Sequence, residues 1–371
     1  MSINALDQGF WWHHIKRPSR SLFCFISFSL PAEVSCGACD MFLYFSGLSV
    51  LLWHFVAIFA SCGGGRYACV LMCGSSCLFI CLPAKIILMN TVWIVMPILI
   101  VLMFLLGTEL RRKAFVDVAR NPRGLFAGLV GQLVILPAIA FLISWLLGLP
   151  PVYFMGVMLI ACCPGGSSSN IFSLLAGGDV ALSVTLTAFS SVITLFTLPL
   201  IMSLAAVFVS NETGLTVELP VGKLLVQNLA LVFVPLVAGV LLRRYRPVAA
   251  AAVGRVLGKA AFPLLMTLAA LFFLQYPQEI IDNFSTLGVA CTLLIMAAML
   301  CSSLLSRLCG ANRASRRTII IEVGMQNAAQ AIAIASSPFI FNSGEMAIPA
   351  IIYALMMNVV LLIYVFVVKR M

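Results

Sequence analysis

The sequence predicts an all-α membrane protein, because its composition, its long apolar runs and its lack of alternating polarity agree. Of its 371 residues, 63% are hydrophobic and only 9% are charged, whereas about 25% of the residues of a soluble domain are charged. Apolar windows of about 20 residues, long enough to cross a bilayer as a helix, recur along the whole chain. Their length and helical spacing exclude a membrane β-barrel.

Spans after residue 89 are separated by loops that hold most of the charged residues. Each span is an apolar run with few or no charges, as a transmembrane helix requires. The predicted spans cover residues 91–108, 124–147, 152–176, 180–208, 224–242, 260–276, 284–306, 316–340 and 346–368.

The formal net charge of +10 indicates membrane orientation and not a nucleic-acid partner. Lys and Arg occur in every second loop and at the C-terminus, while acidic residues predominate in the loops between. By the positive-inside rule, the basic loops and the C-terminus lie in the cytoplasm. A cytoplasmic N-terminus would therefore require one further span before residue 89. The basic segments are 111–123, 243–259, 307–317 and the terminal Lys369 and Arg370.

Residues 1–88 are predicted to be an atypical N-terminal extension before a domain at 89–371 that contains the predicted spans. Two apolar segments occur in the extension, near 41–60 and 67–88, and we expect one of them, not both, to supply the first transmembrane helix. Cysteines recur at every fourth residue from Cys69 to Cys81, which predicts one stripe of a helix. We interpret them as small apolar residues, because no second set of metal ligands accompanies them.

Glu322 is an ionisable residue set inside a long apolar run, which also contains Gly324 and Gln326. A carboxylate in hydrocarbon costs several kcal/mol unless it faces a cavity, a partner or a cation, so it indicates a functional site. The alternative is a structural carboxylate that a helix neighbour neutralises, or a shallower residue, since Arg316 and Arg317 precede it closely.

A second polar stretch, from Cys162 to Asn170, interrupts an uncharged span. Pro164 removes a backbone donor and Gly165 and Gly166 loosen the chain, so the helix should break there. A break exposes backbone groups, which at membrane depth is tolerated only beside protein or a water-filled cavity. The serines and Asn170 that follow can cap the next helix or bind a ligand, and a simple hinge is the other interpretation.

Polar residues also occur in the neighbouring spans. Ser183 and Thr187 lie four residues apart on one helical face, and Gln132 lies inside the span at 124–147. Each can instead bond within or between helices. Two interrupted helices, one in each half of the chain, are nevertheless typical of the binding site of a transporter built from inverted repeats.

Three motifs then give the chain a resemblance to the bile acid:sodium symporter family, in particular to its bacterial-type members, over residues 89–371. The motifs are Cys163-Pro-Gly-Gly-Ser-Ser-Ser-Asn170, Asp179-Val-Ala-Leu-Ser-Val-Thr-Leu-Thr187 and Ile321-Glu-Val-Gly-Met-Gln-Asn327. The resemblance implies about ten transmembrane helices in two inverted five-helix repeats, arranged as panel and core domains with crossing broken helices. It also implies sodium-coupled symport of an organic anion, such as a bile acid, a steroid conjugate or another carboxylate.

The resemblance further implies which residues bind each solute. Met357 stands before Asn358, where some bile-acid-transporting relatives carry His, which puts conjugated bile acids in question. One sodium site would use Ser169, Asn170, Ser183, Thr187 and Glu322, and the other Gln132, Glu322, Gln326 and the backbone carbonyls of Val323 and Met325. Substrate would contact Ser167, Asn327 and Asn358.

The same residues bear on other classes of function. An enzyme is not expected, because no His follows His54 and no Lys lies within a predicted span after residue 89. A sodium/proton antiporter usually has paired intramembrane carboxylates, whereas a proton-coupled anion transporter, in which Glu322 holds a proton, stays open. The expected partners are sodium ions, a small organic anion and the lipid bilayer of the cell membrane, with no nucleic acid and no cofactor. The oligomeric state is not assigned.

Overall fold

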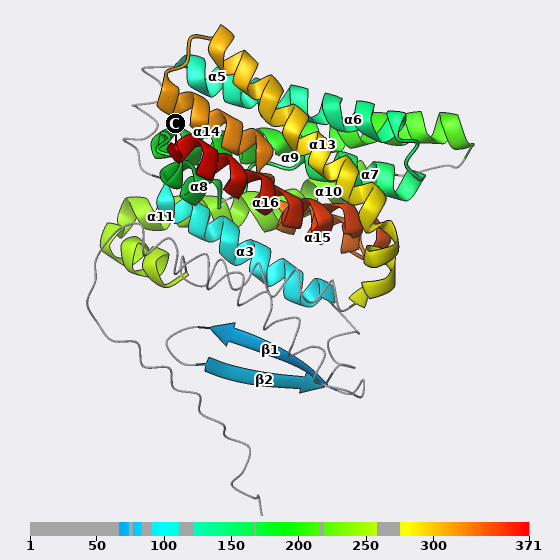
Figure 1. Ribbon diagram of the computed structural model, residues 1–371. Coiled ribbons are helices and arrows are strands. Elements are labelled where there is room, and N and C mark those ends of the chain that lie inside the picture. Colours follow the sequence, from blue (N-terminus) through cyan, green and yellow to red (C-terminus); the bar gives the residue numbers. More distant parts are fainter. Residues whose placement is uncertain are drawn as a thin grey trace, which may run out of the picture. The chain divides into compact units, whose positions relative to one another are not determined.

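The computed structural model describes residues 67–73, 77–83, 91–110, 122–166, 168–214, 219–257 and 275–370 (Figure 1). Two compact units divide the chain, Met1–Ser61 and Cys62–Met371, and all described residues belong to the second. The apolar segment 41–60 and most of the predicted span 260–276 lie outside the described residues. The total of about ten helices and the panel and core domains therefore stay predictions.

Part of the apolar segment 67–88 forms a β-hairpin, so the helical stripe of cysteines predicted there is wrong. Strands β1 (Tyr67–Cys73) and β2 (Cys77–Pro83) pair antiparallel, with Cys69 opposite Cys81 and Cys73 opposite Cys77. The two strands are rich in Val, Ile, Phe and Tyr, which favour extended structure. Each strand has seven residues, fewer than the 9–11 or so that a membrane strand needs. This hairpin is the departure from the predicted all-α fold within the described residues.

Among the residues that the structure describes, five helices are long and apolar enough to cross a membrane. Two of them contain a π-helical turn, η1 or η2, which joins two consecutive α-helices. Large apolar side chains lie exposed along them, for example Phe196, Leu200 and Leu204 on one face of α9, as expected of a surface that meets lipid. The five are α5–η1–α6 (Pro122–Leu146), α9 (Val180–Thr213), α10–η2–α11 (Val221–Tyr245), α13 (Pro277–Leu308), and η3 (Glu345–Ala347) with α16 (Ile348–Arg370).

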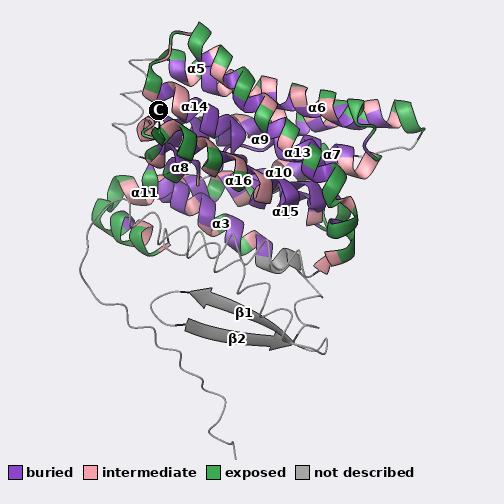
Figure 2. Ribbon diagram, viewed as in Figure 1, coloured by how far each residue is buried: buried purple, intermediate pink, exposed green. Residues whose placement is uncertain are grey.

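Two further helices are interrupted where the sequence predicts. Helix α7 (Pro151–Cys162) stops before Pro164, and α8 begins at Ser169 and ends at Leu175. Helix α14 (Arg313–Gly324) stops at its glycine, and α15 (Ala328–Ser336) follows. Figure 2 shows α14 and α15 as mostly buried, whereas α5 and α6 carry many exposed residues. The interruptions thus lie within the helical bundle.

The two interruptions pair with each other through the backbone. Gly165 and Gln326 form an isolated antiparallel bridge. The Gly166 N–H donates to the Met325 carbonyl at 3.0 Å, and the Asn327 N–H donates to the Pro164 carbonyl at 2.9 Å. Backbone groups that the broken helices would leave unpaired at membrane depth are satisfied in this way. The two interruptions therefore lie against each other, and the crossing of the two broken helices stays a prediction.

Helix α3 (Thr91–Glu109) packs along α11 (Val234–Tyr245) at a glycine pair. A Cβ atom at Gly239 would collide with the Phe104 carbonyl oxygen and lie 2.9 Å from the Gly107 Cα. Small residues let membrane helices approach closely and gain van der Waals contact. A separate helix at Pro247–Leu257 follows α11 along the chain.

Gly239→Ala should destabilise the protein, because the added methyl would separate α3 from α11. We expect a loss of about 1–3 kcal/mol, typical of overpacking, measured as a lower midpoint of thermal unfolding in detergent. Gly288→Ala is the matched control on α13, where a Cβ would meet only Phe284 at an ordinary 3.8 Å. Equal midpoints for the two variants would contradict close packing of α3 against α11.

Candidate cation-binding site

The Glu322 carboxylate lies at the end of α14 and is surrounded by hydroxyl groups. Its side chain is only 1% exposed. Atom Oε1 accepts hydrogen bonds from Ser169 Oγ at 2.7 Å, Ser183 Oγ at 2.7 Å and Thr187 Oγ1 at 2.8 Å. Thr187 Oγ1 also lies 3.2 Å from Oε2. Residues from α8, α9 and α14 therefore meet at one carboxylate.

These contacts favour a ligand site over a carboxylate that a basic neighbour neutralises. Among the described residues no ion pair reaches Glu322, and Arg317 donates instead to the Ala176 carbonyl at 2.9 Å. Hydroxyl groups that donate to a carboxylate keep their oxygen lone pairs. A hard cation could therefore bind those oxygens and the carboxylate together. Such a cation would supply the opposite charge that this buried carboxylate lacks.

Two glutamine side chains approach Glu322 from its backbone side. The Gln132 amide nitrogen lies 3.3 Å from the Glu322 carbonyl oxygen, and the Gln326 amide nitrogen lies 3.4 Å from the same atom. Gln326 also donates to the Val323 carbonyl at 2.9 Å. With their nitrogens so engaged, the side-chain oxygens of Gln132 and Gln326 are buried without a hydrogen-bond partner among the described residues. A buried unpaired acceptor costs about 1–3 kcal/mol, which a bound cation would offset.

Gln132 lies in the π-helical turn η1 (Gly131–Ile135). Pro137, two residues after the turn, has no N–H and its ring would clash with an α-helical carbonyl. The Leu136 N–H bonds to the Gly131 carbonyl, five residues back, so the wider turn lies directly before the proline. Single π turns are frequent at functional sites because they rotate a side chain relative to the helix. Here the side chain is Gln132.

Asn170 also belongs to the predicted first site, but among the described residues its side chain makes no hydrogen bond to Glu322. Its amide nitrogen donates to Glu109 Oε2 at 3.0 Å, at the end of α3. Its side-chain oxygen is buried and has no hydrogen-bond partner among the described residues. Asn170 follows Ser169 at the start of α8, so its unpaired oxygen is a further possible acceptor for a ligand.

Gly165 has no side chain, and this leaves space beside the Glu322 carboxylate and the Gln132 amide. A Cβ atom there would lie 2.5 Å from Glu322 Oε2, 2.8 Å from the Gln132 amide nitrogen and 3.5 Å from Thr187 Oγ1. The backbone of the first interruption therefore borders the carboxylate directly. Any side chain at this position would crowd the Glu322 carboxylate and the Gln132 amide.

The structure describes two of the three residues predicted to contact substrate, Asn327 and Asn358. Ser167 is outside the described residues. Asn327 caps α15, since its side-chain oxygen accepts from the Gln330 N–H at 3.1 Å. Asn358 donates to the Ala354 carbonyl of its own helix at 2.7 Å, and Met357 beside it is buried. Within the described part of the chain, no hydrogen bond joins either asparagine to Glu322.

Sequence reasoning missed two residues at this site. Ser173 is buried and donates to Ser183 Oγ at 3.4 Å. Its position four residues after Ser169, on the same helical face, was the available signal. Glu109 borders the basic segment that starts at Arg111 and therefore reads as an ordinary charged residue at a helix end. Only the fold brings it to Asn170.

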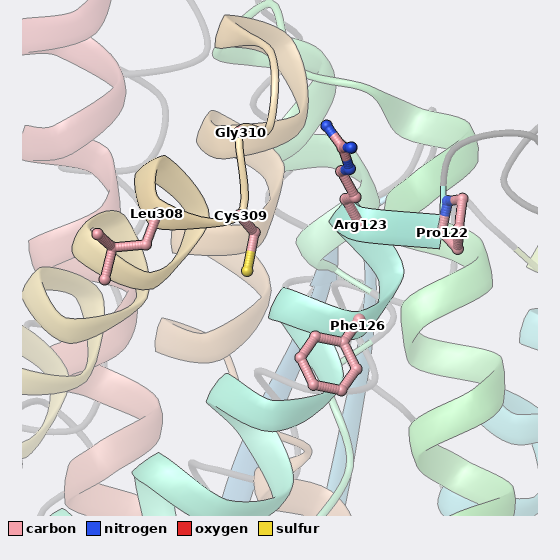
Figure 3. Close-up of a pocket in the computed structure, with 6 residues that line it drawn as sticks. All are labelled: Pro122, Arg123, Phe126, Leu308, Cys309 and Gly310. Atoms are coloured by element: carbon pink, nitrogen blue, oxygen red, sulfur yellow. The ribbon is translucent and has the colours of Figure 1, made fainter.

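A surface cleft of about 550 Å³ lies apart from these residues, between the start of α5 and the end of α13 (Figure 3). None of the predicted site residues lines it. Its walls are Pro122, Arg123, Phe126, Leu308, Cys309 and Gly310.

Comparison with known proteins gives one family. The profile of the Sodium Bile acid symporter family matches residues 96–307. A probable sodium/metabolite cotransporter of Arabidopsis thaliana, BASS1 of the chloroplast, is 37% identical over 218 residues. The sodium-dependent transporter YocS of Bacillus subtilis is 30% identical over 270 residues, which cover 70% of this chain and 77% of the relative.

A rabbit relative, the ileal sodium/bile acid cotransporter of Oryctolagus cuniculus, is 29% identical over 231 residues, covering 62% of this chain and 65% of the relative. The BASS1 match covers 59% of this chain and 53% of the relative. This chain thus spans about half the length of the first curated relatives that it matches. The family profile includes Gln132, the α7–α8 interruption and α9, and it ends before α14.

Proposed function

Because this chain belongs to the Sodium Bile acid symporter family, we propose that it is a sodium-coupled symporter that carries a small organic anion across a membrane. Members of this family are transporters and not enzymes, in agreement with the sequence-based prediction. The supporting observation is the buried Glu322 carboxylate, which three hydroxyl groups contact and no basic residue neutralises within the described part of the chain.

The proposal places two sodium ions around this carboxylate. Sodium is a hard cation that suits neutral oxygen ligands, and hydroxyls, amides and freed carbonyls supply them. The unpaired side-chain oxygens of Gln132, Asn170 and Gln326 support both positions. The first site comprises Ser169, Asn170, Ser183, Thr187 and Glu322, and the second comprises Gln132, Glu322, Gln326 and the Val323 and Met325 carbonyls.

The net charge of the bound ions and Glu322 couples sodium binding to substrate binding. Glu322, shared by both sites, neutralises only half of the charge of two sodium ions. The remaining positive charge favours an anion beside the crossing of the interrupted helices. By linkage, sodium raises the affinity for the anion by the same factor that the anion raises the affinity for sodium. No cofactor is required beyond the coupling ions.

The substrate class remains the broad one: a bile acid, a steroid conjugate or another carboxylate. Ser167, Asn327 and Asn358 are proposed to contact it. The rabbit relative is named for bile acids and BASS1 for a metabolite, so the family includes both kinds of name. We propose that the protein lies in the cell membrane, with the C-terminus in the cytoplasm, because Lys and Arg alternate between its loops.

Uptake by proteoliposomes tests this function. With an inward sodium gradient, we expect wild-type protein to accumulate at least one labelled anion from a conjugated bile acid, a steroid sulfate and a 2-keto acid. Replacing sodium by potassium should abolish the uptake, and a protonophore should leave it intact.

Two other outcomes would contradict symport with sodium. Uptake that is independent of sodium and is abolished by the protonophore would indicate proton coupling. Sodium-driven proton movement without any anion, followed by a dye inside the vesicles, would assign an antiporter. Glu322→Ala in the same vesicles controls for leak.

A further inference from the structure

Glu109 is a carboxylate that reaches the proposed sodium site from a different helix. It is the last residue of α3, whereas the proposed ligands of the first site lie on α8, α9 and α14. Its Oε2 accepts the hydrogen bond of the Asn170 amide nitrogen at 3.0 Å. This hydrogen bond joins the end of α3 to one of the proposed sodium ligands.

The hydrogen bond to Glu109 determines which end of the Asn170 amide remains unpaired. An asparagine side chain carries a donor nitrogen at one end and an acceptor oxygen at the other, and only the oxygen can bind a cation. The Glu109 carboxylate accepts from the Asn170 nitrogen, so the amide oxygen is the end that stays available. The oxygen is left buried, with Asn170 only 8% exposed, and without a hydrogen-bond partner among the described residues.

We propose that Glu109 is a positioning residue of the first sodium site, which holds the Asn170 amide so that its oxygen faces the cation. The inference rests on the proposed function, since it needs sodium at Asn170. Glu109 itself does not bind the ion. Because Glu109 lies on α3, the Asn170 oxygen is correctly presented only when the end of α3 lies within hydrogen-bond distance of α8. Sodium affinity thereby depends on the packing of α3.

Four variants test the proposal through the sodium concentration that gives half of the maximal thermal stabilisation. Glu109→Ala, which removes the acceptor, should raise that concentration about ten-fold, the effect of losing one hydrogen bond to a charged group. Glu109→Gln retains an acceptor oxygen and should give a smaller rise. Asn170→Ala should weaken sodium binding, and adding Glu109→Ala to it should change nothing further, because both act through one amide.

Controls separate this role from a general loss of stability. Glu279→Ala removes a carboxylate from the exposed first turn of α13 and should leave the half-saturating sodium concentration unchanged. Unfolding midpoints in potassium should be similar for wild type and Glu109→Gln. If Glu109→Ala does not fold, Glu109→Asp, whose shorter side chain withdraws the acceptor, takes its place with the same expected rise.

The outcomes also distinguish the inference from the proposed function. A wild type without any sodium-specific stabilisation would refute sodium binding itself. A wild type that responds to sodium, together with an unchanged Glu109→Ala, would refute only the role of Glu109. Equal effects of Glu109→Gln and Glu109→Ala, additive with Asn170→Ala, would indicate action through charge and would also overturn the positioning role.

Discussion

Glu322→Gln should remove the stabilisation that sodium gives to the wild-type protein. A ligand present at about 100 times its dissociation constant stabilises the folded state by about 2.7 kcal/mol. The variant retains the size of the side chain and loses the negative charge shared by the two proposed sites. We therefore expect a sodium-specific shift of the unfolding midpoint, relative to potassium, in wild type and none in Glu322→Gln.

The same variant should fold normally in potassium. An unpaired buried charge is costly, and the amide that replaces it can still accept hydrogen bonds from Ser169 and Ser183. Glu345→Gln is the matched control, because Glu345 begins η3, outside the hydroxyl cluster. A sodium shift in Glu322→Gln equal to that of wild type would remove this carboxylate from the site.

Gly165→Ala should weaken sodium binding about 10- to 100-fold without unfolding the protein. The added methyl would lie 2.5 Å from Glu322 Oε2 and 2.8 Å from the Gln132 amide nitrogen. Relief of such crowding typically costs about 1–3 kcal/mol, here by displacing the groups that would bind the ion. The half-saturating sodium concentration, read from thermal unfolding, measures the effect.

Gly222→Ala provides the control, since a Cβ at Gly222 would meet no atom within 4 Å. It should leave sodium affinity unchanged. If Gly165→Ala bound sodium as wild type does, the backbone at the first interruption could not border the cation. The two sodium ions would then bind away from the interruptions of the two helices.

Local chemistry explains why the interruptions could be predicted. Pro164, Gly165 and Gly166 cannot continue a helix well, and a helix ends in the structure at Cys162. Gly324 likewise ends α14. The isolated carboxylate Glu322 needed partners, and the hydroxyls of Ser169, Ser183 and Thr187 are those partners. These features depend on short segments, which a sequence displays directly.

Features that depend on the packing of distant segments could not be predicted in the same way. The contact between Glu109 and Asn170 joins residues 61 positions apart, and Glu109 looks like an ordinary helix-end charge. The convergence of Gln132 and Gln326 on one carbonyl follows from a π turn and a helix end that only the fold brings together. In the hairpin at 67–83, the every-fourth-residue spacing of cysteines suits a strand as well as a helix.

A measurement of sodium binding to the purified protein is the most direct test of a cation site at Glu322. Purified wild type and Glu322→Gln would be dialysed to equilibrium against radioactive sodium in excess potassium, and the ions bound per folded chain counted. The proposal predicts saturable binding that approaches two ions per chain in wild type and is absent in Glu322→Gln. Folded wild type that binds no sodium, or a variant that binds as much as wild type, would contradict a cation site at Glu322.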